Sequence, residues 1–397
     1  MNPLPIRTKI RPFESLLSLV FRLTEANVYE YPGRILNRLA ESPDKFSTQN
    51  NLNNPNTIRI LSSLNKCSEE DIFSTTSHRF TKFFSHANDS IMDSDLLKNY
   101  VRHSTTQYCP LCVNESGYHR IYWDIIPVTI CLKHKVILQS TCPSCNHPVR
   151  VYSILRNKCN CGKDLLTVNP VDIIPYPEAI RNQVFIQNLL EINESGYSDN
   201  ATQNINSPAM ELSPPDFFRA LKLFSIVLNK LPESSRFLRL GDMTSTPLKW
   251  IREKKRVSNF TNLILINSAA SILLEWPQKF YEFLNEYSTI DRAKYRISGI
   301  VKDFGGLKEL LFYKLDNESF AFIHSTYSNY LNEQWNGGHL SANIKYLDIQ
   351  DKDIQKKHIT TGESRRILGI DYNFILQLIN QKVIKASIIE IKTKNRS

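Results

Sequence analysis

The sequence predicts a mainly α-helical protein with one small β-containing module rich in cysteine and a helix-turn-helix near its C-terminal end. Three observations support this. Apolar residues recur at helical spacing along most of the chain, seven of the eight cysteines fall within positions 109–161, and two short helical patterns separated by glycine lie near the end. Hydrophobic residues make up 41% and charged residues 22%, which is typical of a chain that mostly folds.

The N-terminal part is expected to be helical over residues 12–45, where four apolar residues share one helical face, with Glu14 and Ser15 in the first turn. Helical periodicity resumes at 58–65, and Ser68 before three acidic residues predicts another helix start. The four residues of the apolar face are Leu16, Leu19, Val20 and Leu23.

Composition shifts divide the chain into five predicted regions. The best linker candidate is the polar stretch 193–215, which ends in two prolines, and Asp216 is the expected cap of the helix that follows. Aromatic residues are dense in the fourth region, which indicates either core packing at helical spacing or a base-stacking surface. The regions are a helical 1–104, the cysteine module at 105–166, a helical segment and linker at 167–215, a second helical domain at 216–340, and a small basic unit at 341–397.

Cysteine spacing is the strongest signal in the sequence. Close pairs of thiols, with one histidine, give eight ligands, enough for two tetrahedral sites of the zinc-ribbon or zinc-knuckle kind. Four protein ligands leave no open position for water, so both Zn²⁺ ions are expected to be structural. The first site is predicted from Cys109, Cys112, Cys131 and His134, and the second from Cys142, Cys145, Cys159 and Cys161.

The surroundings of these ligands carry further expectations. Pro110 and Pro143 fit the knuckle turns, and residues 122–130 read as β-rich. The nearby histidines His119 and His147 are expected at the surface rather than as ligands.

The formal net charge of +10 favours an anionic partner, with nucleic acid the leading candidate. The cysteine module is itself basic, which indicates either phosphate or partner contacts or simply a solvated face. The candidate contact residues are Arg120, Lys133, Lys135, Arg150, Arg156 and Lys158.

Residues 359–386 match a helix-turn-helix pattern, in which Gly369 ends one helix and Asp371 caps the next. A strand pair, or wing, could follow over 383–394. In proteins that read DNA the second helix enters the major groove, although the same fold also serves protein interaction. The candidate contact residues here are Arg365, Arg366, Tyr372, Asn373 and Gln377.

Catalytic patterns are missing from the sequence, which contains neither a phosphate-binding glycine loop nor a nucleophile elbow. The chain is therefore expected to be a binding protein and not an enzyme, with a zinc hydrolase as the disfavoured alternative. No stretch predicts a secretion signal or a membrane span, and the paired cysteines favour a reducing compartment, so the bacterial cytoplasm is the expected location.

Several motifs together resemble the TniQ/TnsD family of transposon target selectors. The resemblance covers most of the chain and is most specific at 108–112, Trp123, 131–134 and 142–145. The remaining matching residues are Pro3, Pro5, the run 14–16, Arg22, 275–277, Phe280, 283–284 and 335–337.

The resemblance implies the partners. Members of this family link a chosen DNA target to a transposition machine. One branch binds attachment-site DNA, and another docks as a homodimer on an RNA-guided CRISPR effector complex of the Cascade type. Both help to recruit an AAA+ ATPase regulator that licenses the transposase. The resemblance further implies a TniQ domain at 1–104, a TnsD-like domain at 216–340, and metal-binding roles for the eight predicted ligands.

Overall fold

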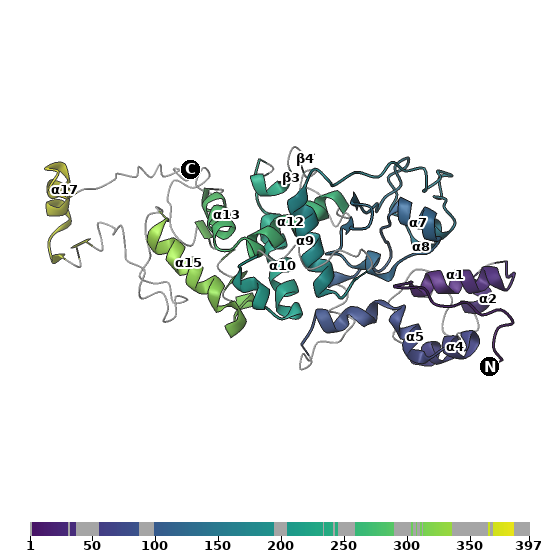
Figure 1. Cartoon of the computed structure of the whole chain (residues 1–397). Helices are drawn as coiled ribbons and strands as arrows, with labels where there is room; N and C mark the ends of the chain where they lie inside the picture. Colours follow the sequence, from purple (N-terminus) through teal and green to yellow (C-terminus); the bar gives the residue numbers. More distant parts are fainter. Residues whose placement is uncertain are drawn as a thin grey trace, which may run out of the picture. The chain divides into compact units, whose positions relative to one another are not determined.

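The computed structural model describes residues 2–30, 32–36, 55–86, 99–193, 205–232, 234–240, 243–244, 259–289, 303–304, 307, 310–311, 313–335, 364–365 and 368–384. These residues are mainly helical, with two small two-stranded sheets (Figure 1). The predicted fold class is therefore confirmed in its main feature. None of the described helices is both long enough and apolar enough to cross a membrane.

The chain divides into two compact units, the first made of residues 1–229 and 236–274 and the second of residues 230–235 and 275–397. The first unit contains α1 (Leu16–Ala26), α2 (Gly33–Leu36), α4 (Pro55–Asn65), α5 (Glu69–Ser74), η2 (Ser77–Phe83), α7 (Pro110–Ser116), η3 (Ile121–Asp124), β1 (Ile130–Cys131), β2 (Val136–Ile137), α8 (Val151–Leu155), α9 (Pro177–Leu189), η5 (Pro208–Glu211), α10 (Pro214–Leu228), η6 (Arg236–Leu238), β3 (Arg239–Leu240), β4 (Met243–Thr244) and α12 (Asn259–Leu274). The second contains α13 (Gln278–Thr289), η7 (Glu318–Phe320), α15 (Ala321–Glu333) and α17 (Tyr372–Asn380). The domain boundaries drawn from composition stay predictions.

Helix α1 forms as its sequence predicts, because its apolar residues share one face. Its four predicted core residues are at most 1% exposed, and they pack with residues of α4 and α5 into one hydrophobic cluster. Ser15 is the N-cap and accepts from the backbone N–H of Ser18, so Glu14 precedes the helix and does not lie in its first turn.

Helix α5 begins with a reciprocal cap. The Ser68 hydroxyl accepts from the backbone N–H of Asp71, and the Asp71 carboxylate accepts from the backbone N–H of Ser68. The helix start predicted at Ser68 is therefore confirmed.

Helix α12 is buried on all sides, because nearly every residue from Leu263 to Leu274 is apolar or small. It packs against α9 and α10. Helix α10 starts at Pro214, with Ser213 as its cap, so the cap predicted at Asp216 is wrong. Proline suits the first helical turn because the missing N–H would have no partner there.

Most of the aromatic residues that are frequent in 216–340 pack in the core, in agreement with the first of the two interpretations of the sequence. In the second unit, Trp276 stacks on Phe280 at 4.4 Å between ring centroids, and its indole N–H donates to the Thr326 hydroxyl at 3.1 Å. Phe304 packs edge-on against Trp335 in the same unit. Tyr313 is an exception at 55% exposed.

The stretch 122–130 is wrongly predicted as β-rich. Residues 121–124 form the 3-10 helix η3, and only Ile130 and Cys131 belong to a strand. Trp123 is fully buried and packs edge-on against the ring of His119. Large apolar residues at consecutive positions here fill a core from a tight turn, which local composition does not distinguish from a buried strand.

Candidate metal centres

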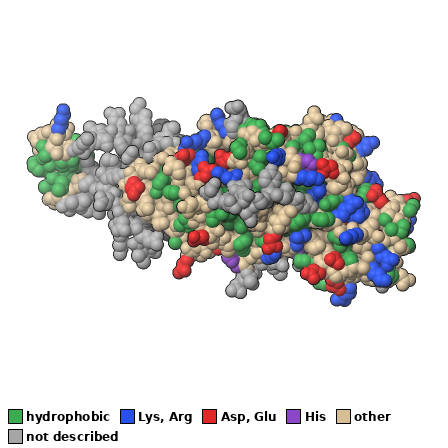
Figure 2. All heavy atoms as spheres, viewed as in Figure 1, with side chains coloured by type: hydrophobic (Ala, Val, Ile, Leu, Met, Phe, Trp, Pro, Cys, Tyr) green, Lys and Arg blue, Asp and Glu red, His purple; other side chains and the backbone are tan. Residues whose placement is uncertain are grey.

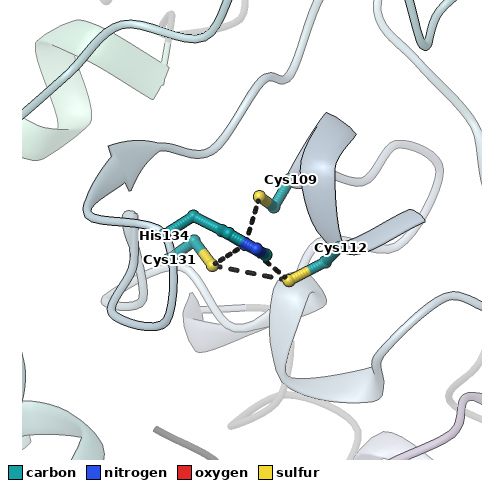
Figure 3. A group of neighbouring side chains, drawn as sticks. All are labelled: Cys109, Cys112, Cys131 and His134. Atoms are coloured by element: carbon teal, nitrogen blue, oxygen red, sulfur yellow. Dashed lines mark hydrogen bonds between the residues drawn. The ribbon is translucent and has the colours of Figure 1, made fainter. Parts of the chain in front are cut away.

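Helix α7 positions the first two thiols. Cys109 is its N-cap, Pro110 occupies the first helical position, and Gly117 ends it with a φ of +65°. Cys112 lies one turn further along, so both sulfurs lie on the same side of the helix start (Figure 3). Pro110 thus starts a short helix, where a simple knuckle turn was predicted.

The β1–β2 hairpin supplies the other two ligands. Cys131 pairs with Val136 at the end of the hairpin, and His134 lies in the turn between the strands. Lys135 adopts the left-handed conformation with a φ of +54°, which closes this turn. The Cys131 and His134 side chains point toward those of Cys109 and Cys112 (Figure 3).

The distances in this first set fit a tetrahedral ion. The Nδ1 atom of His134 lies 3.4, 3.2 and 3.6 Å from the sulfurs of Cys109, Cys112 and Cys131, and the last two sulfurs are 3.6 Å apart. Tetrahedral zinc bonds of about 2.3 Å to sulfur and 2.0 Å to nitrogen place two sulfurs roughly 3.8 Å apart and sulfur and nitrogen roughly 3.5 Å apart. The arrangement of the four side chains is therefore compatible with one tetrahedral zinc ion.

Charge supports a cation at the same place. Interaction with the neighbouring Cys112 thiol raises the pKa of Cys109 to about 12, and interaction with the Cys109 thiol raises the pKa of Cys131 to about 12. Because three crowded and largely buried thiolates repel one another, they need a positive ion to ionise together.

Glu115 orients the histidine ligand. Its Oε1 atom lies 2.8 Å from Nε2 of His134, on the opposite side of the ring from the sulfurs. Lys133 and then His134 lower the pKa of the Glu115 carboxyl, which keeps it ionised as an acceptor. Sequence spacing did not single out Glu115, although its position one turn after Cys112 on the same helix is the local signal.

Buried side-chain amides hold the hairpin from outside. Gln183 on α9 donates to the carbonyl of Pro127 at 2.9 Å and accepts from the backbone N–H of Thr129 at 3.0 Å. Gln187 donates to the carbonyl of Ile130 at 3.0 Å, and Asn259 of α12 donates to that of Leu138 at 2.5 Å. These bonds tie the metal hairpin to the helical core, because buried carbonyls need partners.

The second set also converges. The sulfurs of Cys142 and Cys161 are 3.7 Å apart, and those of Cys145 and Cys159 are 3.6 Å apart. All four ligand atoms lie within 4.8 Å of one another. Gly162 has a φ of +90°, which glycine tolerates, and donates its N–H to the carbonyl of Cys159, which closes the tight turn between the last two thiols.

The two sets differ in burial. Every cysteine of the first set is buried, whereas Cys161 in the second is exposed. Both sets are compatible with the two structural zinc ions predicted from spacing, and each offers four ligand atoms, as a closed site requires. Cys67 is half-buried beside the α1 core and belongs to neither set.

The basic candidates of the cysteine module differ in exposure and in their contacts. Arg120 is only 5% exposed, and its guanidinium lies over the rings of Tyr118 and Trp123. Lys133 pairs with Glu115, and Arg156 lies over the ring of Tyr152 at 4.2 Å. Lys135 is half-buried, whereas Arg150 and Lys158 are exposed. On the face drawn in Figure 2, basic and acidic side chains are interspersed over the described surface.

At the C-terminal unit, the predicted start of the second helix is confirmed. Asp371 caps α17, its carboxylate accepting from the backbone N–H of Asn373 at 3.0 Å, and Gly369 has a φ of +65°. Tyr372, Asn373, Gln377 and Arg365 are all exposed. Arg366 and most of the predicted wing lie outside the described residues, so the helix-turn-helix stays a prediction.

His119 is wrongly predicted as a surface residue, whereas His147 is exposed as expected. The His119 ring is fully buried, with Nε2 2.7 Å from the Thr106 hydroxyl. Burial, with the nearby Arg120 charge, lowers the pKa of His119 to about 3, so this ring is neutral. Its backbone binds the α1 region: its carbonyl accepts from Ser15 and its N–H donates to the Ser18 hydroxyl.

The contacts between α1 and the cysteine module lie inside the segment that matches a known protein family. Residues 5–138 match the TniQ family model. We call this segment the TniQ region. It contains all four residues of the first ligand set and ends before Cys142, so the second set, α9 and everything beyond lie outside the match. A comparison with curated proteins found no match.

Proposed function

We propose that this chain is a non-enzymatic target-selection adaptor in transposition. The observation that carries the proposal is the TniQ region, in which the first cysteine set has the geometry of a closed metal site. A closed set offers no open position for a metal-bound water, which favours a structural over a catalytic role. When bound, Zn²⁺ would crosslink α7 to the β1–β2 hairpin.

The finer proposal is that the adaptor links an RNA-guided CRISPR effector complex of the Cascade type to an AAA+ ATPase regulator and, through it, to the transposase. It would act as a homodimer, with 216–340 as the TnsD-like part. A selector of this kind needs a rigid body with separate binding faces. The hydrogen bonds from the side-chain amides of Gln183, Gln187 and Asn259 to the hairpin region supply such rigidity.

One observation favours the alternative, a direct reader of attachment-site DNA. Tyr372 and Asn373 are exposed at the start of α17 and Gln377 is exposed further along it, as on a recognition helix. Amide side chains at such positions can form two hydrogen bonds to adenine.

Binding measurements on the zinc-loaded protein separate the two versions. The adaptor version expects tight binding to the effector complex and weak, sequence-blind DNA binding at two salt concentrations. The reader version expects one DNA sequence to bind roughly 10³–10⁷ times more tightly than others and to weaken steeply with salt.

A matched pair of variants tests the role of α17. Replacing Asn373 and Gln377 together by alanine would abolish sequence preference in the reader version, while the control Asn380→Ala on the same helix would not. Failure to bind the effector, the regulator and attachment-site DNA alike would overturn the proposed function as a whole.

A further inference from the structure

A partly open pocket lies in the first unit between α10 and α12, with residues 99–100 and 126–127 completing its lining. Its volume is about 240 Å³. None of its lining residues belongs to either ligand set, so the metal centres do not account for it.

The wall of this pocket is largely apolar. Leu221 and Leu265 form buried parts of it, and Ile226 remains 42% exposed at its edge. An apolar group of another molecule that bound in this hollow, against the exposed aliphatic side chain, would be removed from water, which is favourable.

Among the described residues, Lys222 is the only charged one that lines the pocket. It is half-buried, and its ammonium nitrogen lies 5.4 Å from the centroid of the Tyr100 ring. No carboxylate of the described residues pairs with it. Burial lowers the pKa of Lys222, since its charge is partly desolvated without a counter-charge. A carboxylate brought into the pocket would offset that cost.

Asn229 adds an acceptor. Its Oδ1 atom is buried and has no hydrogen-bond partner in the described part of the chain, although a buried acceptor ordinarily has one. Asn262, another amide side chain in the lining, already has a partner, because it donates to the carbonyl of Ile126 at 2.7 Å. The pocket therefore offers an apolar hollow and one cation, and its wall holds an unsatisfied amide oxygen that a rotation of the Asn229 side chain would present.

We propose that this pocket docks a segment of a partner protein that presents an apolar side chain next to a carboxylate. The apolar side chain would enter between Leu221, Ile226 and Leu265, and the carboxylate would pair with Lys222. A backbone N–H of the segment would donate to Asn229 once its amide turns toward the pocket, which favours a peptide over a fatty acid, since an acyl chain has no N–H. The proposal rests on the pocket alone and does not depend on a role in transposition.

Short peptides test this on the full-length, zinc-loaded protein. The probes have the form Gly-Ser-X-Asp-Gly-Ser, with X as Leu, Ile, Phe or Trp, and binding is measured by fluorescence anisotropy of a labelled N-terminus. We expect at least one of them to bind. Changing its Asp to Asn, or X to Ser, should weaken binding by about tenfold or more, as for a lost charged hydrogen bond or a lost buried side chain.

Variants of the protein localise the site. Lys222→Gln should weaken the Asp peptide about tenfold and leave the Asn peptide unchanged, while Lys9→Gln, at an exposed lysine before α1, should alter neither. Lys222→Glu should bind the peptide in which Lys replaces Asp, which a merely misfolded variant would not do. Zinc content and circular dichroism check that each variant is folded.

Three results would overturn the proposal. The first is that no peptide of the set binds at millimolar concentration. The second is equal binding of Asp and Asn peptides, which would make the pocket a purely apolar surface. The third is binding that Lys222→Gln and Lys222→Glu both leave intact, which would place the peptide elsewhere on the chain.

Discussion

Glu115 and His134 lie on either side of one imidazole hydrogen bond: Oε1 of the carboxylate is 2.8 Å from Nε2, while Nδ1 of the same ring faces three sulfurs. A carboxylate that holds the outer nitrogen of a ligand histidine fixes the ring orientation and raises its basicity. This arrangement makes Glu115 a part of the first metal centre although it is not itself a ligand.

Glu115→Ala is therefore expected to weaken zinc binding at the first set by about 10- to 100-fold and to leave the second set unchanged. The loss follows because the His134 ring would be free to rotate and its Nε2 would have only water as a partner. Competition with a chromogenic chelator measures the two affinities: one zinc ion per chain should be bound more weakly than in the wild type, and the other equally tightly.

Two controls frame that experiment. Glu211→Ala removes an exposed carboxylate outside the cysteine module and should leave both affinities as they were. Lys133→Ala should have little effect, since Lys133 is half-exposed and its ion pair with Glu115 lies at the surface. If Glu115→Ala bound both zinc ions with the affinities of the wild type, the carboxylate would not support the histidine ligand.

The cysteines allow a stoichiometric test. Cys112→Ser and Cys161→Ser should each lower the zinc content from two ions to one, and Cys67→Ser should leave it at two. The two losses should differ in stability, because Cys112 is 1% exposed within the core of the module and Cys161 is exposed. Elemental analysis gives the zinc content, and near-ultraviolet circular dichroism reports the packing of the aromatic side chains, Trp123 among them. Two ions retained by Cys112→Ser would refute the first site.

Local sequence predicted what local geometry determines. The stripe of α1, the Ser68 cap and both ligand sets depend on spacings of a few residues or on close cysteine pairs, and each is found where the spacing put it. The hydrogen bond from the Gln183 side chain to the Pro127 carbonyl joins residues more than fifty positions apart. The burial of His119 depends on packing against Trp123. A single sequence carries no spacing signal for such contacts, so these parts of the site were missed.

His119 should make the protein less stable in acid. Its pKa is about 3 in the folded chain against an ordinary value of 6.5, so between these values the unfolded chain binds a proton that the folded chain does not. Stability therefore falls as the pH drops below 6.5, by up to about 1.4 kcal/mol per pH unit from this group. Urea unfolding of the wild type and of His119→Gln at pH 7.5 and 5.5 measures the difference.

The variant separates this effect from acid release of zinc, which both proteins share. His119→Gln is expected to be less stable than the wild type at pH 7.5 but to lose about 1 kcal/mol less between the two pH values. Equal losses in the two proteins would mean that His119 is not held neutral by its burial.

Glu14 provides the last test, at the entrance to α1. Its carboxylate is buried and receives three donors: the Arg22 guanidinium at 2.6 Å, the Ser18 hydroxyl at 3.1 Å and the backbone N–H of Arg11 at 3.1 Å. Glu14→Ala would leave the mostly buried Arg22 without its counter-charge, and breaking a buried pair in this way costs roughly 3–5 kcal/mol.

Glu25→Ala is the matched control, since Glu25 is exposed on the same helix and its loss should change the unfolding free energy by less than about 0.5 kcal/mol. Chemical denaturation followed by far-ultraviolet circular dichroism compares the two variants. Because the backbone beside Glu14 also bonds to His119 of the cysteine module, Glu14→Ala should weaken zinc retention at the first set as well. A Glu14→Ala protein as stable as Glu25→Ala would show that α1 and the module hold together without this ion pair.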